Sequence, residues 1–170
     1  MDTTSQEEAK EKLFAMIKDI RTAQLVTRDR EGKMHARPMH AQQEEFDGEL
    51  WFFTSKHSPK VREILHDEQV LLSYASPEKN DYVSINGRAE IVTERAEIEA
   101  RWNELLRVWF PEGKESEEIA LIRVTVELAE YWDANASALV HLYGYVKARL
   151  TGERPEGGEN RVVSFRKKPA

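Results

Sequence analysis

The segment Leu50-Trp51-Phe52-Phe53-Thr54-Ser55-Lys56-His57-Ser58-Pro59-Lys60 joins an expected strand to an expected helix. Its apolar start is typical of a strand. The helical pattern that follows begins with Ser58, a good N-cap, and Pro59, which suits the first helical position. Backbone N–H groups at a helix start attract anions, phosphate above all, and Lys60 adds a positive charge there. We therefore expect a phosphate site at this junction, although the chain has no standard phosphate loop.

A second feature, Arg37-Pro38-Met39, lies in a strand expected over residues 33–43. Strand alternation places Arg37 and Met39 on one face and Pro38 on the other, and the proline indicates a sheet edge or a bulge. An arginine on an inner face needs an anionic partner, which a phosphate held by Lys60 and the Ser58 helix start would supply. The alternative is that Arg37 pairs with a surface carboxylate and Lys60 is solvated.

Composition and charge limit the possible function classes. The chain has 170 residues, no cysteine and a net charge of −6. The length predicts one compact domain, and the negative charge argues against a general nucleic-acid binder. The absence of cysteine excludes disulfides and thiolate chemistry and fits a cytoplasmic protein. The polar N-terminus is not expected to be a signal peptide, and no apolar stretch reaches membrane-spanning length, so we expect no membrane partner. The histidines lack the spacing of a zinc site, so we expect no metal.

Hydrophobic periodicity predicts the remaining elements. Helices are expected over residues 5–20, 58–66, 94–108 and 134–150, and strands over 23–27, 33–43, 49–54, 70–74, 82–92 and 119–132. Asp47-Gly48 predicts a hairpin, and Gly87 indicates a bulge or a close backbone approach. Hairpin-linked strands with peripheral helices predict a mainly β, α+β architecture, an antiparallel barrel.

The domain is expected to span residues 1–150. The charged tail, 151–170, is expected to be mobile, with Val162, Val163 and Phe165 offering a way for part of it to dock.

Several short motifs occur in a specific order along the chain: Ala36-Arg37-Pro38-Met39, Leu50 to Thr54, Ser58-Pro59-Lys60-Val61, Tyr82 to Glu90, Trp109 to Gly113, and Ile122 to Asp133. Together they resemble the bacterial general stress protein branch of the pyridoxamine phosphate oxidase-like superfamily, whose members are FMN-binding split β-barrels. The resemblance covers residues 8 to 150.

The resemblance implies a homodimer with FMN at the subunit interface. Arg37, Ser58 and Lys60 would hold the FMN phosphate. Pro38 and Met39 would line the isoalloxazine, while Phe53 and Thr54 would contact the ring edge and the ribityl chain, with Ser55 in the same cofactor-binding set. Trp132 is a candidate flank of the flavin, donated by the partner chain, with a role as a core aromatic as the alternative.

The expected function is that of an FMN-dependent oxidoreductase linked to a stress response. No side chain identifies itself as a catalytic acid or base. Pyridoxamine phosphate oxidase activity itself is not expected, because residues 161–170 lack the Arg-Leu-x-Pro type element of the true oxidases. The alternatives are a non-catalytic flavin-binding, storage or sensing protein and, more distantly, a split barrel that uses a deazaflavin.

Overall fold

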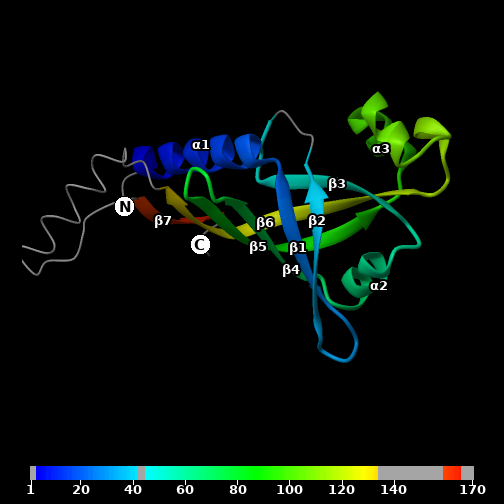
Figure 1. The fold of residues 1–170 in the computed structure, drawn as a ribbon, viewed down its shortest axis with the longest axis horizontal. Coiled ribbons are helices and arrows are strands. Elements are labelled where there is room, and N and C mark those ends of the chain that lie inside the picture. Colours follow the sequence, from blue (N-terminus) through cyan, green and yellow to red (C-terminus); the bar gives the residue numbers. More distant parts are fainter. Residues whose placement is uncertain (1–2, 42–44, 134–158, 166–170) are drawn as a thin grey trace, which may run out of the picture.

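The computed structural model describes residues 3–41, 45–133 and 159–165, and these form one curved sheet with helices around it (Figure 1). The strands are all antiparallel to their neighbours, in the order β2-β1-β4-β5-β6-β3, with β7 also paired to β6. Their bounds are β1 Thr22–Arg28, β2 Met34–His40, β3 Glu49–Ser55, β4 Gln69–Ser76, β5 Asp81–Val92, β6 Ile119–Asp133 and β7 Glu159–Ser164. The expected mainly β architecture is confirmed, with a sheet that is not closed.

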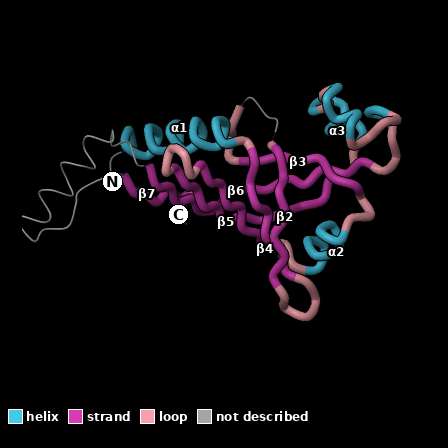
Figure 2. The backbone as a smooth tube through the Cα atoms, viewed as in Figure 1, coloured by secondary structure: helices cyan, strands magenta, loops and turns pink. Residues whose placement is uncertain are grey.

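The helices lie around the sheet (Figure 2). They are α1 Thr3–Ile20, α2 Pro59–His66 and α3 Arg95–Arg101, with two short 3₁₀ helices, η1 Glu104–Val108 and η2 Gly113–Glu115. The α1 helix packs on β4, β5 and β7 and places Leu13 and Ile17 in the main core, whereas α2 packs on β1 and β5. No helix in the described part of the chain has the length and apolarity needed to cross a membrane.

The long β6 strand organises the sheet because it has different neighbours along its two sides. Along one side it pairs with β5 over almost its whole length. Along the other it pairs first with β3 and then with β7, which meet near Glu127. The register shifts between Asn86 and Gly87, and a Cβ at Gly87 would lie 2.5 Å from the carbonyl oxygen of Thr125. The bulge and the close approach predicted at Gly87 are both present.

The prediction of one helix over residues 94–108 is wrong in one respect, because the segment forms two helices, α3 and η1. The backbone of Trp102 is extended, and the side chain of Asn103 accepts a hydrogen bond from the Leu105 N–H to begin η1. An asparagine that caps the next turn competes with continuation of the helix. The resulting angle folds α3 and η1 over a second, smaller core that contains Ile98, Leu106 and Phe110.

The tail also differs from expectation over residues 159–165. Residues Glu159–Ser164 form β7 instead of a mobile segment, because the second half of β6 offers a free backbone edge beyond the end of β3. The expected docking is confirmed for Val163, which is fully buried, and for Phe165, which packs edge-on against Phe46 at 5.5 Å. The helix predicted over 134–150 lies outside the described residues, as does the rest of the tail.

Candidate functional site

The polar residues of the strand-to-helix junction come together as the sequence predicts. Thr54 is the last inward-facing residue of β3 and is buried, while Ser58 directly precedes α2. The two hydroxyl oxygens lie 3.2 Å apart, and the ammonium of Lys60 donates to the Thr54 hydroxyl at 3.1 Å. The Ser58 side chain makes no hydrogen bond to its own helix. A cation, two hydroxyls and the start of a helix therefore converge at one point.

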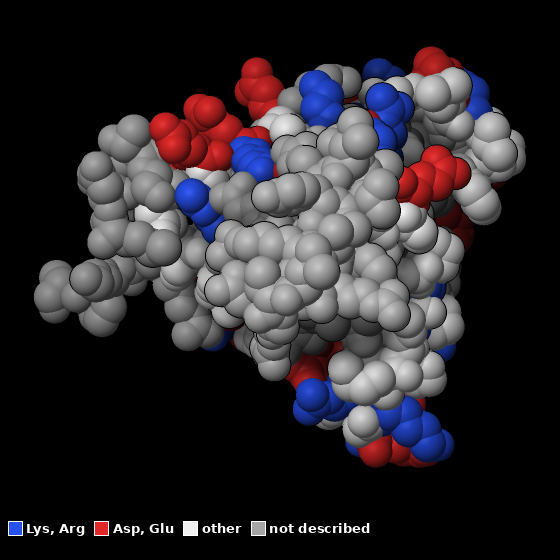
Figure 3. Space-filling view, turned by 60° about the vertical axis from the view of Figure 1, so that its left-hand side comes forward, with Lys and Arg blue, Asp and Glu red and all other residues white. Residues whose placement is uncertain are grey.

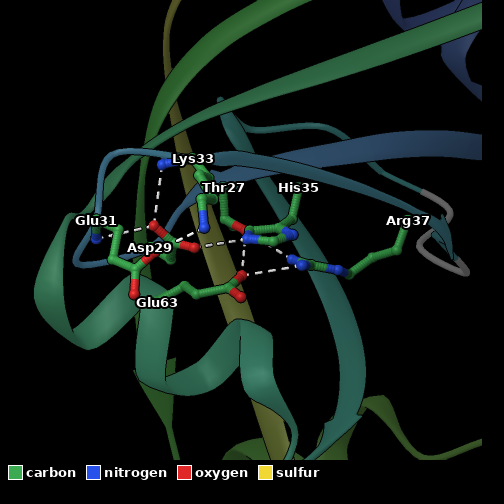
Figure 4. Close-up of polar contacts among 7 residues, drawn as sticks. All are labelled: Thr27, Asp29, Glu31, Lys33, His35, Arg37 and Glu63. Carbon is green, nitrogen blue, oxygen red and sulfur yellow. Dashed lines mark hydrogen bonds and ion pairs between the residues drawn. The ribbon is translucent and has the colours of Figure 1, made fainter.

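Arg37 approaches the same helix from β2, an edge strand of the sheet. Its guanidinium donates from Nη1 to the hydroxyl of Thr27 at 2.6 Å and from Nη2 to the carboxylate of Glu63 at 2.9 Å (Figure 4). The Thr27 hydroxyl donates in turn to the same Glu63 oxygen at 2.5 Å. Arg37 thus pairs with a carboxylate, which is the first part of the alternative to a phosphate partner. That carboxylate is largely buried on α2, with a side chain 11% exposed.

Electrostatic effects connect Arg37 to Lys60. Burial and, secondly, the positive charge of Arg37 lower the pKa of the Lys60 ammonium, while Glu63 opposes the shift. Burial alone would raise the pKa of the Glu63 carboxyl, yet hydrogen bonds from Thr27 and Arg37 hold it below its ordinary value. Two cations therefore share one internal carboxylate, which leaves a positive balance at the junction that suits an anion.

The other residues of Arg37-Pro38-Met39 lie where strand alternation predicts. Met39 is buried in the main core, on the same face of β2 as Arg37, and Pro38 is exposed on the opposite face. The expected edge position is also correct, because β2 ends the strand order. Of the three, Arg37 forms the ion pair with α2, through Glu63.

Phe53, Ser55 and Trp132 are the other residues that the resemblance assigns to the flavin. Within a single chain, each of them makes contacts outside the Thr54, Ser58 and Lys60 cluster. Phe53 packs edge-on against Trp102 at 6.0 Å, beside the second core, and the Ser55 hydroxyl accepts from the His57 N–H at 3.3 Å. Thr54 pairs with Ala120 of β6, and Trp132 lies twelve residues further along that strand. This is a span of ~40 Å at ~3.3 Å per residue.

Thr27 and Glu63 are the members of the cluster that the sequence patterns did not single out. Thr27 is opposite His35 in the β1–β2 register and is fully buried, which places its hydroxyl beside Arg37. Glu63 lies one helical turn after Lys60 and so shares its side of α2. The three-residue spacing from Lys60 was the one sequence signal that could have pointed to Glu63. It does not reveal which strand the helix packs against.

A cleft of about 860 Å³ adjoins this cluster, between α2 and the turn that joins β1 to β2. Its walls include His35, Arg62, Glu63 and His66. At the turn, the Asp29 carboxylate accepts from the backbone N–H groups of residues 31 and 33 and contacts the His35 ring at 2.8 Å. The His35 hydrogen bond is the main cause of a lowered pKa for Asp29. Acidic and basic side chains lie together at this end of the molecule, at the bottom of Figure 3.

Comparison with known structures confirms the expected fold. A general stress protein 26 from Jannaschia sp. CCS1 superposes with a TM-score of 0.75 at 22% identity, covering 94% of this chain and 99% of that one. The general stress FMN/FAD binding protein from Xanthomonas citri is 31% identical, with a TM-score of 0.67, and the match covers 77% of this chain and 92% of that one. The open antiparallel sheet is therefore a split β-barrel.

A curated relative and a family match extend the comparison. Protein bli-3 of Neurospora crassa is 26% identical over 124 residues, which are 68% of this chain and 59% of that protein, so the match spans less than two thirds of the relative. The model of the family described as "Pyridoxamine 5'-phosphate oxidase like" matches residues 8–156, most of the chain. This chain belongs to the pyridoxamine 5'-phosphate oxidase-like family.

Proposed function

We propose that this protein binds FMN and acts as a flavin-dependent oxidoreductase in a stress response. The observation that carries the proposal is the meeting of Lys60, Ser58 and Thr54 at the start of α2, with Arg37 close enough to lower the pKa of Lys60. A phosphate with about two negative charges would offset the mutual repulsion of the two cations and accept hydrogen bonds from the hydroxyls. Met39 and Phe53, which the family resemblance places against the ring, lie on β2 and β3, the strands that carry Arg37 and Thr54.

Relatives support the same cofactor and setting. The Xanthomonas citri protein that binds FMN or FAD is named a general stress protein and is 31% identical to this chain. In flavoproteins the flavin supplies the redox chemistry, and the protein binds it, orients it and excludes water. The chain's own contribution, in this proposal, is to fix the phosphate at α2 and so place the ring.

We further propose that the working unit is a homodimer. Tyr82, Leu128, Trp132 and Val162 lie on the face of β5, β6 and β7 opposite the buried one, and they are 37% to 51% exposed. An apolar patch on a sheet face is typical of an interaction surface, and a two-fold axis would cover it twice. Because Trp132 is far from Thr54 along β6, only a partner chain would bring a Trp132 beside the flavin.

The first test is an FMN titration of the purified protein, followed by visible absorbance and flavin fluorescence. We expect near-stoichiometric binding, and a Kd raised about 10- to 100-fold in Lys60→Ala, because a charge-assisted contact to phosphate is lost. Lys79→Ala is the matched control, since Lys79 pairs with Asp19 on the surface, away from α2. Wild-type protein that stays colourless and binds no added FMN would refute the proposal.

A second measurement addresses the reaction. We expect NADH or NADPH to bleach the absorbance of the bound flavin under anaerobic conditions, and admission of oxygen to restore it. Flavin that binds stoichiometrically and is reduced by neither donor would contradict the oxidoreductase part of the proposal and favour a flavin-binding or storage role.

A further inference from the structure

We infer that Glu63 is a resident counter-anion of the phosphate site, which competes with bound phosphate for Arg37 and thereby sets the affinity for phosphorylated flavin. The inference rests on the proposed function and concerns a residue of α2 that the motifs of the sequence did not include. It makes Glu63 a specificity-determining residue, because its charge affects a flavin with a phosphate and not one without.

The contacts of Arg37 are the first step. Both terminal nitrogens of its guanidinium are engaged, one with Thr27 and the other with Glu63 (Figure 4). Thr27 also donates to Glu63, so the three side chains form a closed triangle of hydrogen bonds. An incoming phosphate that uses Arg37 must either share the guanidinium with this carboxylate or displace it. In both cases the negative charge of Glu63 opposes the negative charge of the phosphate.

Charge around the triangle is the second step. Lys60 has its pKa lowered by burial and by Arg37, and raised by Glu63, so all three charges interact. Without a phosphate, Glu63 offsets the repulsion between the two cations. With a phosphate bound, the same carboxylate is a second anionic group in a site that has two cations. Its removal would strengthen the attraction for phosphate, provided that Arg37 keeps its position.

The neighbouring cleft supplies the third step, because it gives the carboxylate room to move. Glu63 lines the cleft of about 860 Å³, together with Arg62 and His66 of the same helix. A carboxylate turned away from Arg37 would therefore enter a polar space, lined by charged side chains of both signs, instead of an apolar core. This lowers the cost of displacement and makes competition between the carboxylate and a phosphate feasible.

The test compares FMN with riboflavin, which has the same ring and no phosphate. The ratio of the riboflavin Kd to the FMN Kd measures the contribution of the phosphate. We expect Glu63→Gln to increase this ratio about tenfold, since the amide oxygen can still accept from Thr27 and Arg37 while the charge is gone. Riboflavin affinity should stay within about twofold of the wild type. Glu63→Ser, which removes the same charge and leaves room for water beside Arg37, is the second variant and should change the ratio in the same direction.

Glu68→Gln is the matched control, because Glu68 also contacts an arginine, Arg88 at 3.2 Å, and lies outside the cluster. Its ratio should equal that of the wild type. A ratio that is unchanged or reduced in both Glu63 variants, in protein that binds FMN more tightly than riboflavin, would overturn this inference alone. Wild-type protein that binds neither flavin would instead overturn the proposed function, and the inference with it.

Discussion

Glu63 links the candidate site to the stability of the fold. Its carboxylate is 11% exposed and accepts hydrogen bonds from Thr27 and Arg37. Removal of one partner from a buried ion pair is costly, because the other charge stays behind without compensation. The charge that would oppose a bound phosphate in the proposed site is therefore also the charge that neutralises Arg37 in the folded chain. Stability without ligand and tight binding of phosphate are opposing demands on this one residue.

The pH dependence of stability tests this role. Burial would raise the pKa of Glu63, but the Thr27 and Arg37 hydrogen bonds hold it below 4.5, its ordinary value. A group with a lowered folded-state pKa stabilises the fold above its unfolded-state pKa, and this contribution is lost as the pH falls through the folded-state pKa. We expect the free energy of unfolding of Glu63→Gln to be about 2 kcal/mol lower than that of the wild type at pH 7, and the difference to shrink as the pH falls below 4.5, the ordinary value of a glutamate. Urea unfolding over a pH series from 7 downward measures it, and a difference that does not decrease at all on acidification below pH 4.5 would contradict the assignment.

At the scale of elements, local pattern predicted most of the sheet. The strands expected over 49–54, 82–92 and 119–132 are found as Glu49–Ser55, Asp81–Val92 and Ile119–Asp133, because apolar alternation and turn residues determine them. The start of α2 was also predictable, from Ser58 and Pro59. Thr54, Ser58 and Lys60 meet because they lie within seven residues of one another at that junction.

The elements that were missed depend on contacts distant in sequence. β7 forms because β6 extends beyond the end of β3 and leaves an edge to pair with. Glu63 reaches Arg37 because α2 packs on β1, which no local pattern specifies. The break at Trp102 and Asn103 is different, because an asparagine at a helix start is a local signal. The prediction of one continuous helix over 94–108 followed the apolar spacing and did not use that signal.

The contribution of β7 is open to a direct test. Val163 is fully buried in the main core, so Val163→Ala removes apolar volume and should lower the free energy of unfolding by about 1–3 kcal/mol. Val108→Ala is the matched control, because the same change is made to a side chain that is 80% exposed on η1 and should cost less than about 0.5 kcal/mol. Chemical unfolding of the two variants beside the wild type gives both values. Equal losses for the two would contradict the docking of this strand into the core.

At the scale of the whole molecule, the described part of one chain holds the two halves of the proposed flavin site far apart. The phosphate-binding cluster lies where β3 meets α2, while Trp132 lies near the other end of β6, ~40 Å away along the strand. The exposed apolar face of β5, β6 and β7 surrounds this second half. In the proposed homodimer, two copies related by a two-fold axis would place each half beside its complement, and dimerisation would then be a condition for flavin binding.

Leu128→Lys tests that condition, because it places a charge on the apolar face, eight residues along β6 from Ala120, the partner of Thr54. A buried unpaired charge at an interface is strongly unfavourable, so we expect the wild type to have the mass of a dimer by light scattering and the variant that of a monomer. Its FMN Kd should rise about tenfold or more. Trp109→Lys is the control, since Trp109 is 78% exposed at the end of η1, outside β5, β6 and β7, and its loss should leave the mass and the Kd unchanged. A monomeric Leu128→Lys variant that binds FMN as tightly as the wild type would show that a single chain forms the whole site.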